Sequence, residues 1–144
     1  KKANGTTLTK DKSYTVSYAS GRKNVGTYKV TVTMKGNYTG TKTLTFKINP
    51  PKTTVASLTA GTKSITVAVT KKTTQTTGYQ IQYSTSKDFT NAKTKTITSN
   101  TTTKATLSSL TSAKTYYVRV RTYKTVNDVK YYSGWSEYKY VKTK

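Results

Sequence analysis

A period of two constrains this chain more than any other feature, because apolar and polar residues alternate through most of its length. Successive side chains of a β-strand point to opposite faces, so the alternation predicts strands with one buried and one solvated face. Threonine is abundant and 13 residues are tyrosines, and both types suit a half-solvated sheet. Only 32% of the residues are hydrophobic, but disordered tracts lack such periodic aromatic and β-branched residues. The sequence therefore predicts an all-β fold.

In the first third of the chain, three alternating runs are separated by the turn-like stretches SGRKN and KGNYTG. The pattern stops at Asn49-Pro50-Pro51, since proline cannot donate to a strand ladder and paired prolines favour stiff, extended geometry. We therefore predict a first domain over 1–49 and a short, semi-rigid linker over 50–52. One buried face of the first domain should hold Tyr14, Val16, Tyr18, Tyr28, Val30, Val32, Met34, Leu44, Phe46 and Ile48.

Three strands give the first domain only one half-covered sheet. Domains below roughly 70 residues rarely bury enough core without disulfides or metals. The stretch KSYTVSYASGRKNVGTYKVTVTMKGNYTGTKTLTFKI, from Lys12 to Ile48, resembles the C-terminal part of a bacterial immunoglobulin-like surface repeat. Members of that family usually carry further strands before this point, so the resemblance implies a truncated β-sandwich. We expect upstream residues or another chain to complete it.

The rest of the chain, 53–144, shows short strands at the spacing typical of a β-sandwich. Its motifs SITVAV, GYQIQYSTS, LTSAKTYYVRVRTY and YYSGWSE resemble a fibronectin type III domain. Together the two segments predict tandem β-sandwich modules, the second with seven strands. Those strands are expected at Val55–Ala60, Ser64–Thr70, Gly78–Ser84, Lys93–Ser99, Thr102–Leu107, Thr115–Thr125 and Ser136–Thr143.

The second resemblance implies structural roles for three residues. Leu110 and Tyr116 match the tyrosine corner of the family, in which the phenol hydroxyl bonds back to the backbone. Trp135 lies in GWSE, which resembles a motif that stacks a tryptophan against arginines of the neighbouring strand. Arg119 and Arg121 are placed to receive it. The chain departs from the family in having valine where a core tryptophan usually ends the second strand.

The chain lacks the residues on which most catalysis and metal binding depend. General acid–base catalysis needs groups that titrate near the working pH, and a serine nucleophile needs an adjacent base. Metal sites need histidine, cysteine or clustered carboxylates. This chain has no histidine and no cysteine, and its four acids are scattered: Asp11, Asp88, Asp128 and Glu137. We predict a protein that is not an enzyme and has no metal or cofactor.

One outward sheet face is the candidate binding surface. If Tyr116 points inward, strand alternation places its neighbours outward, and the last strand adds further aromatic residues. A flat platform of Tyr, Arg and Gln could stack sugars or grip an anionic polymer. Cross-strand aromatic and charged pairs are also ordinary sheet stabilisers, and this second interpretation is the favoured one. The candidate residues are Tyr117, Arg119, Arg121, Tyr123, Tyr138 and Tyr140.

The charge is extreme: 26 Lys and Arg face four acids, for a net charge of +22. The lysines are spread along the whole chain instead of forming one stripe, and they far outnumber arginine, which phosphate and base contacts favour. The sequence thus predicts no specific nucleic-acid partner, and no apolar run is long enough for membrane insertion. The charge either solubilises strand edges or attracts a polyanion, such as wall teichoic acid.

The two resemblances imply an extracellular protein, secreted or attached to the cell wall, like modular proteins of Gram-positive bacteria. We expect a non-catalytic spacer or stalk, weakly adhesive, whose partners are other domains of the same polypeptide. Two alternatives stay open. One is an accessory module of a secreted hydrolase, binding a cell-wall polymer or a host or dietary glycan. The other is a non-specific binder of polyanions.

Overall fold

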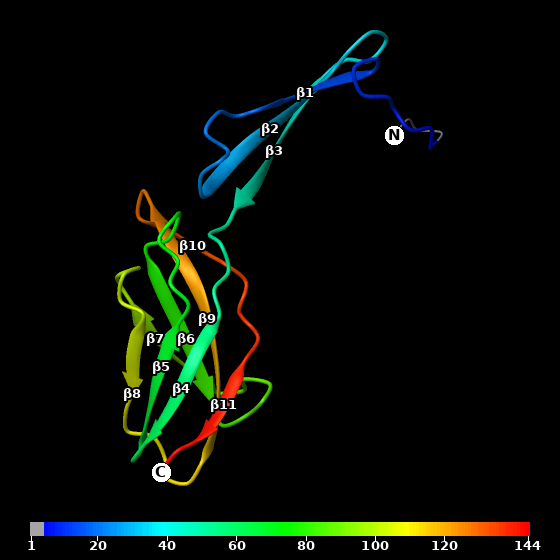
Figure 1. The fold of residues 1–144 in the computed structure, drawn as a ribbon. Helices are drawn as coiled ribbons and strands as arrows, with labels where there is room; N and C mark the ends of the chain where they lie inside the picture. Colours follow the sequence, from blue (N-terminus) through cyan, green and yellow to red (C-terminus); the bar gives the residue numbers. More distant parts are fainter. Residues whose placement is uncertain (1–4) are drawn as a thin grey trace. The chain divides into compact units, whose positions relative to one another are not determined.

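Residues 5–144 are described by the computed structural model, and within them the secondary structure consists of strands without a helix (Figure 1). The all-β prediction is therefore confirmed. The chain divides into two units, Lys1–Ile48 and Asn49–Lys144. Because the described residues form no helix, they include none long and apolar enough to cross a membrane.

The first unit is a three-stranded antiparallel sheet in the order β1-β2-β3. Its register places apolar residues opposite one another, with Val16 beside Val32 and Tyr28 beside Phe46. The apolar side chains predicted to share a face do share one. The strands are β1 (Tyr14–Tyr18), β2 (Gly26–Met34) and β3 (Thr41–Ile48).

The apolar face of this sheet stays partly open to solvent. Tyr18 is 53% exposed and Leu44 50%. Aromatic contacts supply part of its cohesion: the Phe46 ring lies 5.9 Å from that of Tyr28 and 6.3 Å from that of Tyr18. The Tyr28 hydroxyl also donates toward the carbonyls of Gly21 and Asn24, which fixes the turn before β2.

The second unit has two antiparallel sheets, as a sandwich requires (Figure 1). One sheet has the order β4-β5-β8. The other has the order β10-β9-β6-β7, and β11 also pairs with β9. The strands are β4 (Val55–Gly61), β5 (Ser64–Val69), β6 (Gly78–Ser84), β7 (Lys93–Ile97), β8 (Lys104–Leu107), β9 (Thr115–Val126), β10 (Val129–Tyr132) and β11 (Lys139–Lys142).

The last strands differ from the prediction. The sequence predicts seven strands in this segment, whereas the structure has eight, because a hairpin joins β9 to β10. Its two turn residues, Asn127 and Asp128, both have positive φ, which suits the tight turn that joins two hairpin strands. β10 pairs with the second half of β9 and β11 with the first half. They therefore form one edge strand that is interrupted between 133 and 138.

The inward residues of both sheets form one apolar core between the layers. Val67, Ile81 and Val118 have no exposed surface, and Val141 packs against the core as expected from its strand position. Two lysines close the edges of the sandwich. The Lys95 ammonium donates to the Thr106 carbonyl, and that of Lys139 donates to the Ala56 carbonyl.

The predicted tyrosine corner is present. The Tyr116 hydroxyl accepts a hydrogen bond of 3.0 Å from the N–H of Thr111, five residues earlier, and Leu110 is buried beside it. Thr143 ties the same turn to the end of the chain, since its hydroxyl donates to the Thr111 carbonyl. The corner therefore fixes how the chain crosses from β8 to β9.

Tyr116→Phe is expected to lower the free energy of unfolding of the second unit by ~1 kcal/mol, because the N–H of Thr111 loses its partner. Chemical denaturation followed by the fluorescence of Trp135 measures this, since it is the one tryptophan of the chain. An unchanged midpoint would show that the hydrogen bond contributes nothing to stability.

Candidate functional site: an arginine and aromatic ladder

The outer face of the sheet that contains β6 and β9 carries a stack of alternating guanidinium groups and aromatic rings. The Trp135 ring lies between two of them, 5.0 Å from the guanidinium carbon of Arg119 and 4.3 Å from that of Arg121. On their other sides, the guanidinium carbon of Arg119 lies 4.0 Å from the centre of the Phe89 ring, and that of Arg121 lies 4.0 Å from the centre of the Tyr132 ring. We call these five residues the ladder. Its arginine and tryptophan contacts are those the sequence predicts.

Glutamines of the adjacent strand β6 hold the arginines in place. The register sets Gln82 beside Arg119 and Gln80 beside Arg121. The Arg119 Nε donates to Gln82 Oε1 at 2.7 Å, and Arg121 donates from Nε and Nη2 to Gln80 Oε1 at 2.9 and 2.7 Å. Burial lowers the pKa of both guanidinium groups, but arginine stays protonated in proteins. Both arginines therefore keep their positive charge, and their guanidinium groups are held in one orientation and partly shielded from solvent.

Two serines bind the segment that carries Trp135 to β9. The Ser133 hydroxyl accepts the N–H of Thr122, and the Ser136 hydroxyl accepts the N–H of Val120. The serine backbone N–H groups donate in return to the carbonyls of the same two residues, at 3.1 and 2.8 Å. Between β10 and β11, serine hydroxyls thus take the place of the backbone carbonyls that would accept these N–H groups in a regular strand. The bulged segment that results places the indole over the arginines.

Three of the candidate platform tyrosines form a separate cluster at one end of the ladder. The Tyr117 ring contacts those of Tyr138 at 5.5 Å and Tyr140 at 5.8 Å. Tyr140 is 67% exposed, and Tyr138 also lies against Phe89. The outward placement of these residues with Arg119 and Arg121 agrees with the strand alternation.

Tyr123 is the exception to the predicted platform. It follows the same alternation, but only 3% of it is exposed, so its ring is not available to stack a ligand. The β9–β10 hairpin covers it: the Tyr132 ring lies 6.2 Å away and the Lys130 ammonium 5.5 Å from its centroid. Burial raises the pKa of the Tyr123 hydroxyl, and Tyr132 adds to that rise.

Two ladder members, Phe89 and Tyr132, are not predicted by the sequence. Phe89 comes from the β6–β7 turn, where its positive φ of 63° turns the ring back onto Arg119. Such a loop residue has no periodicity to reveal it. Tyr132 precedes the GWSE motif, and only the pairing of β10 with β9 sets it beside Tyr123.

The family to which the second unit belongs follows from a direct comparison. The profile of the family described as "Fibronectin type III domain" matches residues 49–138, more than half of the chain. The chain belongs to the fibronectin type III family. No curated protein is found to match it.

Solved structures show the same fold at low sequence identity. The chain resembles the chicken CNTN1 FN1-FN3 domains with 19% identity and a TM-score of 0.58, over 83% of this chain and 43% of that one. It resembles domains A168-A170 of titin with 17% identity and a TM-score of 0.50, over 90% of this chain and 48% of that one. The chain thus spans less than half the length of either structure.

In this fibronectin type III domain, an aspartate fixes the turn that presents Phe89. Asp88 Oδ1 accepts hydrogen bonds from the Ser86 hydroxyl at 2.6 Å and from the N–H of Thr90 at 2.9 Å. These hydrogen bonds lower the pKa of Asp88 to about 2, with the Ser86 hydroxyl contributing most. The described residues contain no group of acids, histidines or cysteines that could hold a metal ion.

The depressed pKa of Asp88 predicts a pH-dependent contribution to stability. Because the folded value lies below the unfolded one, the contribution is complete above about pH 4 and is lost as the pH falls through about 2. Asp88→Asn should therefore be less stable than the parent at neutral pH, and the difference should shrink between pH 4 and 2. Denaturation midpoints across that range test this, and a constant difference would contradict it.

Proposed function

We propose that this chain is a non-catalytic spacer, or stalk, in a secreted or cell-wall-attached bacterial modular protein. There it displays other domains of the same polypeptide and adheres weakly to its surroundings. The ladder is the observation that carries the proposal. The cationic and aromatic groups that would recognise a ligand on the outer face are already engaged with one another and with Gln80 and Gln82.

Membership of the fibronectin type III family supports this proposal, because a domain of this fold is compatible with a structural role. The resemblance of Lys12–Ile48 to a bacterial immunoglobulin-like surface repeat supports the cellular context. Function is assigned from the site and not from the fold, and here the site-level observation is that the ladder side chains contact one another.

Mechanical unfolding of single molecules tests the spacer role. The second unit should resist extension and unfold in one step, and Arg121→Lys should lower its unfolding force, since an ammonium cannot replace the planar stacked guanidinium. Arg22→Lys in the first unit is the matched control and should leave that force unchanged. Extension of the second unit without a resolved unfolding step would contradict the proposal.

The net charge of +22 favours a second candidate, non-specific binding of polyanions such as wall teichoic acids. Within residues 5–144 the one ion pair joins Lys10 and Asp11 at 3.9 Å, so nearly all of the positive charge is free of internal acidic partners. Binding to a purified teichoic acid should then weaken steeply with salt, and no single lysine substitution should abolish it.

The cluster of the half-buried Tyr117 and Tyr138 with the exposed Tyr140 favours a third candidate, an accessory module that binds glycans at this outer face. Replacing all three by alanine should abolish retention on an insoluble polysaccharide if this candidate is correct. Retention that is equal for parent and variant would exclude it for that polymer.

A further inference from the structure

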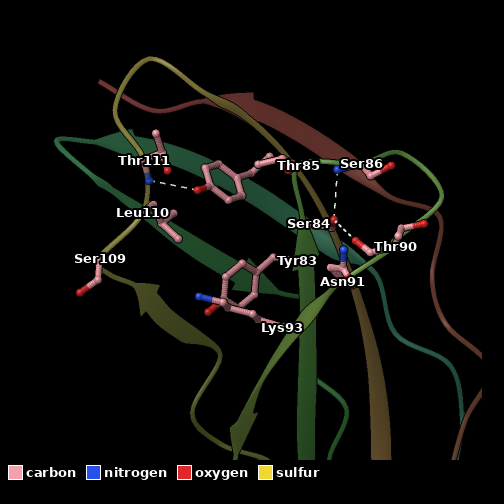
Figure 2. A pocket seen from close by; sticks show the side chains of 11 residues that line it. Tyr83, Ser84, Thr85, Ser86, Thr90, Asn91, Lys93, Ser109, Leu110 and Thr111 are labelled. Carbon is pink, nitrogen blue, oxygen red and sulfur yellow. Dashed lines mark hydrogen bonds between the residues drawn. The ribbon is translucent and has the colours of Figure 1, made fainter.

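The second unit has a cavity of about 470 Å³ between the β6–β7 and β8–β9 turns (Figure 2). Tyr83 of β6 pairs with Lys93 of β7 on one side and with Val118 of β9 on the other. The side chains of the three residues therefore lie on the same, inner face of the sheet. Tyr116 lies two residues before Val118 and points the same way. The cavity is therefore an open end of the space between the two sheets.

The rim formed by the β6–β7 turn is fixed by hydrogen bonds. The buried Ser84 hydroxyl donates to the Thr90 carbonyl and accepts the N–H of Ser86, as Figure 2 shows. Asp88 accepts from the same two residues of the turn. Asn91, which lines the cavity, has a positive φ of 52°, a conformation that costs energy outside glycine unless the surroundings impose it.

The opposite rim, the β8–β9 turn, is fixed just as firmly. The N–H of Leu110 donates to the Lys63 carbonyl, and that of Thr111 donates to the Tyr116 hydroxyl. Ser109 beside them has a positive φ of 57°. Because hydrogen bonds fix both rims, less conformational entropy is lost when a ligand binds between them.

The lining combines aromatic and hydroxyl groups with one cation. Tyr83 offers a phenol ring, Tyr116 offers a phenol hydroxyl, the Asn91 amide and several Ser and Thr hydroxyls offer hydrogen bonds, and Lys93 offers an ammonium. None of the lining residues that the structure describes carries a carboxylate. Rings beside hydroxyls suit the apolar and polar faces of a pyranose, and the lone cation suits an acidic substituent.

We propose that this cavity binds an acidic sugar unit, a pyranose bearing a carboxylate. The sugar ring packs on Tyr83, and the carboxylate accepts hydrogen bonds from the Lys93 ammonium and the Tyr116 hydroxyl. Within residues 5–144 that hydroxyl accepts the N–H of Thr111 and makes no other hydrogen bond, so its proton is available. The site shares no lining residue with the ladder or with the cluster of Tyr117, Tyr138 and Tyr140, and it does not depend on the spacer role.

A matched pair of small probes tests this inference: methyl glucuronide, and methyl glucoside, in which CH₂OH replaces the carboxylate. In an NMR titration of the full chain, the glucuronide should shift amide signals of 83–93 and 109–116. It should bind about tenfold more tightly than the glucoside, the scale of a charged hydrogen bond. Absence of shifts in these two segments at high probe concentration would overturn the proposal.

Variants separate this site from general charge attraction. Lys93→Gln should remove the preference for the glucuronide, and Tyr83→Leu should weaken both probes while keeping apolar bulk at that position. Lys104→Gln, an exposed strand lysine of β8 away from the cavity, is the matched control and should leave both affinities unchanged. Equal losses in Lys93→Gln and Lys104→Gln would mean non-specific attraction and overturn the proposal. Thermal unfolding of each variant confirms that it is folded.

Discussion

Tyr79→Phe is expected to lower the free energy of unfolding of the second unit by about 2–3 kcal/mol, although it removes a single oxygen atom. Tyr79 has no exposed surface. Its hydroxyl accepts the N–H of Lys72 at 2.8 Å and shares its proton between the carbonyls of Lys72 at 3.0 Å and Asn100 at 2.8 Å. Phenylalanine fills the same space but leaves three backbone groups without this partner.

The hydroxyl of Tyr79 joins two loops that are distant in sequence. Asn100 extends the connection, since its amide donates to the carbonyls of Thr73 and Thr76. The β5–β6 and β7–β8 loops are therefore held together by one polar network above the core. Amide exchange in Tyr79→Phe should increase in both loops at once.

Tyr83→Phe is the matched control for this experiment. Tyr83 lies on the same strand and packs partly against the same core, but its hydroxyl makes no hydrogen bond within residues 5–144. Its removal should change the stability by less than ~0.5 kcal/mol. Equal losses from Tyr79→Phe and Tyr83→Phe would show that the network of Tyr79 adds nothing beyond ring packing.

The sequence predicts most of the sandwich because strand alternation fixes which side of a sheet a residue occupies. Arg119 and Arg121 could be placed on the outer face, and the GWSE motif could bring Trp135 to them. Alternation does not show what covers a face. Tyr123 is on the predicted side but is buried, because the β9–β10 hairpin folds over it.

Contacts made by loops explain the rest of what the sequence could not show. Phe89 reaches the ladder from a turn of left-handed residues, and Asn100 reaches Tyr79 from another loop. The cavity has the same origin, since it forms between two turns that are distant in sequence, one holding Asn91 and the other Ser109. None of these contacts leaves a local pattern, because each depends on tertiary packing.

Trp135→Ala should lower the free energy of unfolding of the second unit by about 2–3 kcal/mol. A cation–π contact contributes about 0.5–1 kcal/mol when exposed and about 2 when desolvated, and the indole makes two such contacts with partly buried arginines. Loss of its packed apolar surface adds to the effect. Since the variant has no tryptophan, circular dichroism during denaturation is the appropriate measurement.

Tyr140→Ala is the matched control for this second substitution. Tyr140 is an aromatic residue of the same outer face, but it is 67% exposed and touches only the ring of Tyr117 among the described aromatic side chains. Its removal should cost less than ~1 kcal/mol. If both substitutions cost the same, the tryptophan acts as ordinary surface cover and the ladder has no special place in the stability of the domain.

Amide exchange distinguishes loss of the ladder from a general loss of stability. In Trp135→Ala, the N–H groups of Val120 and Thr122 should exchange faster than their neighbours in β9, because their partners are the hydroxyls of Ser136 and Ser133 on the segment that the indole holds down. Amides of β5 in the opposite sheet should change only by the global loss of stability. Uniform acceleration across both sheets would mean that the bulged segment is held by its serines alone and that the indole adds nothing to its attachment.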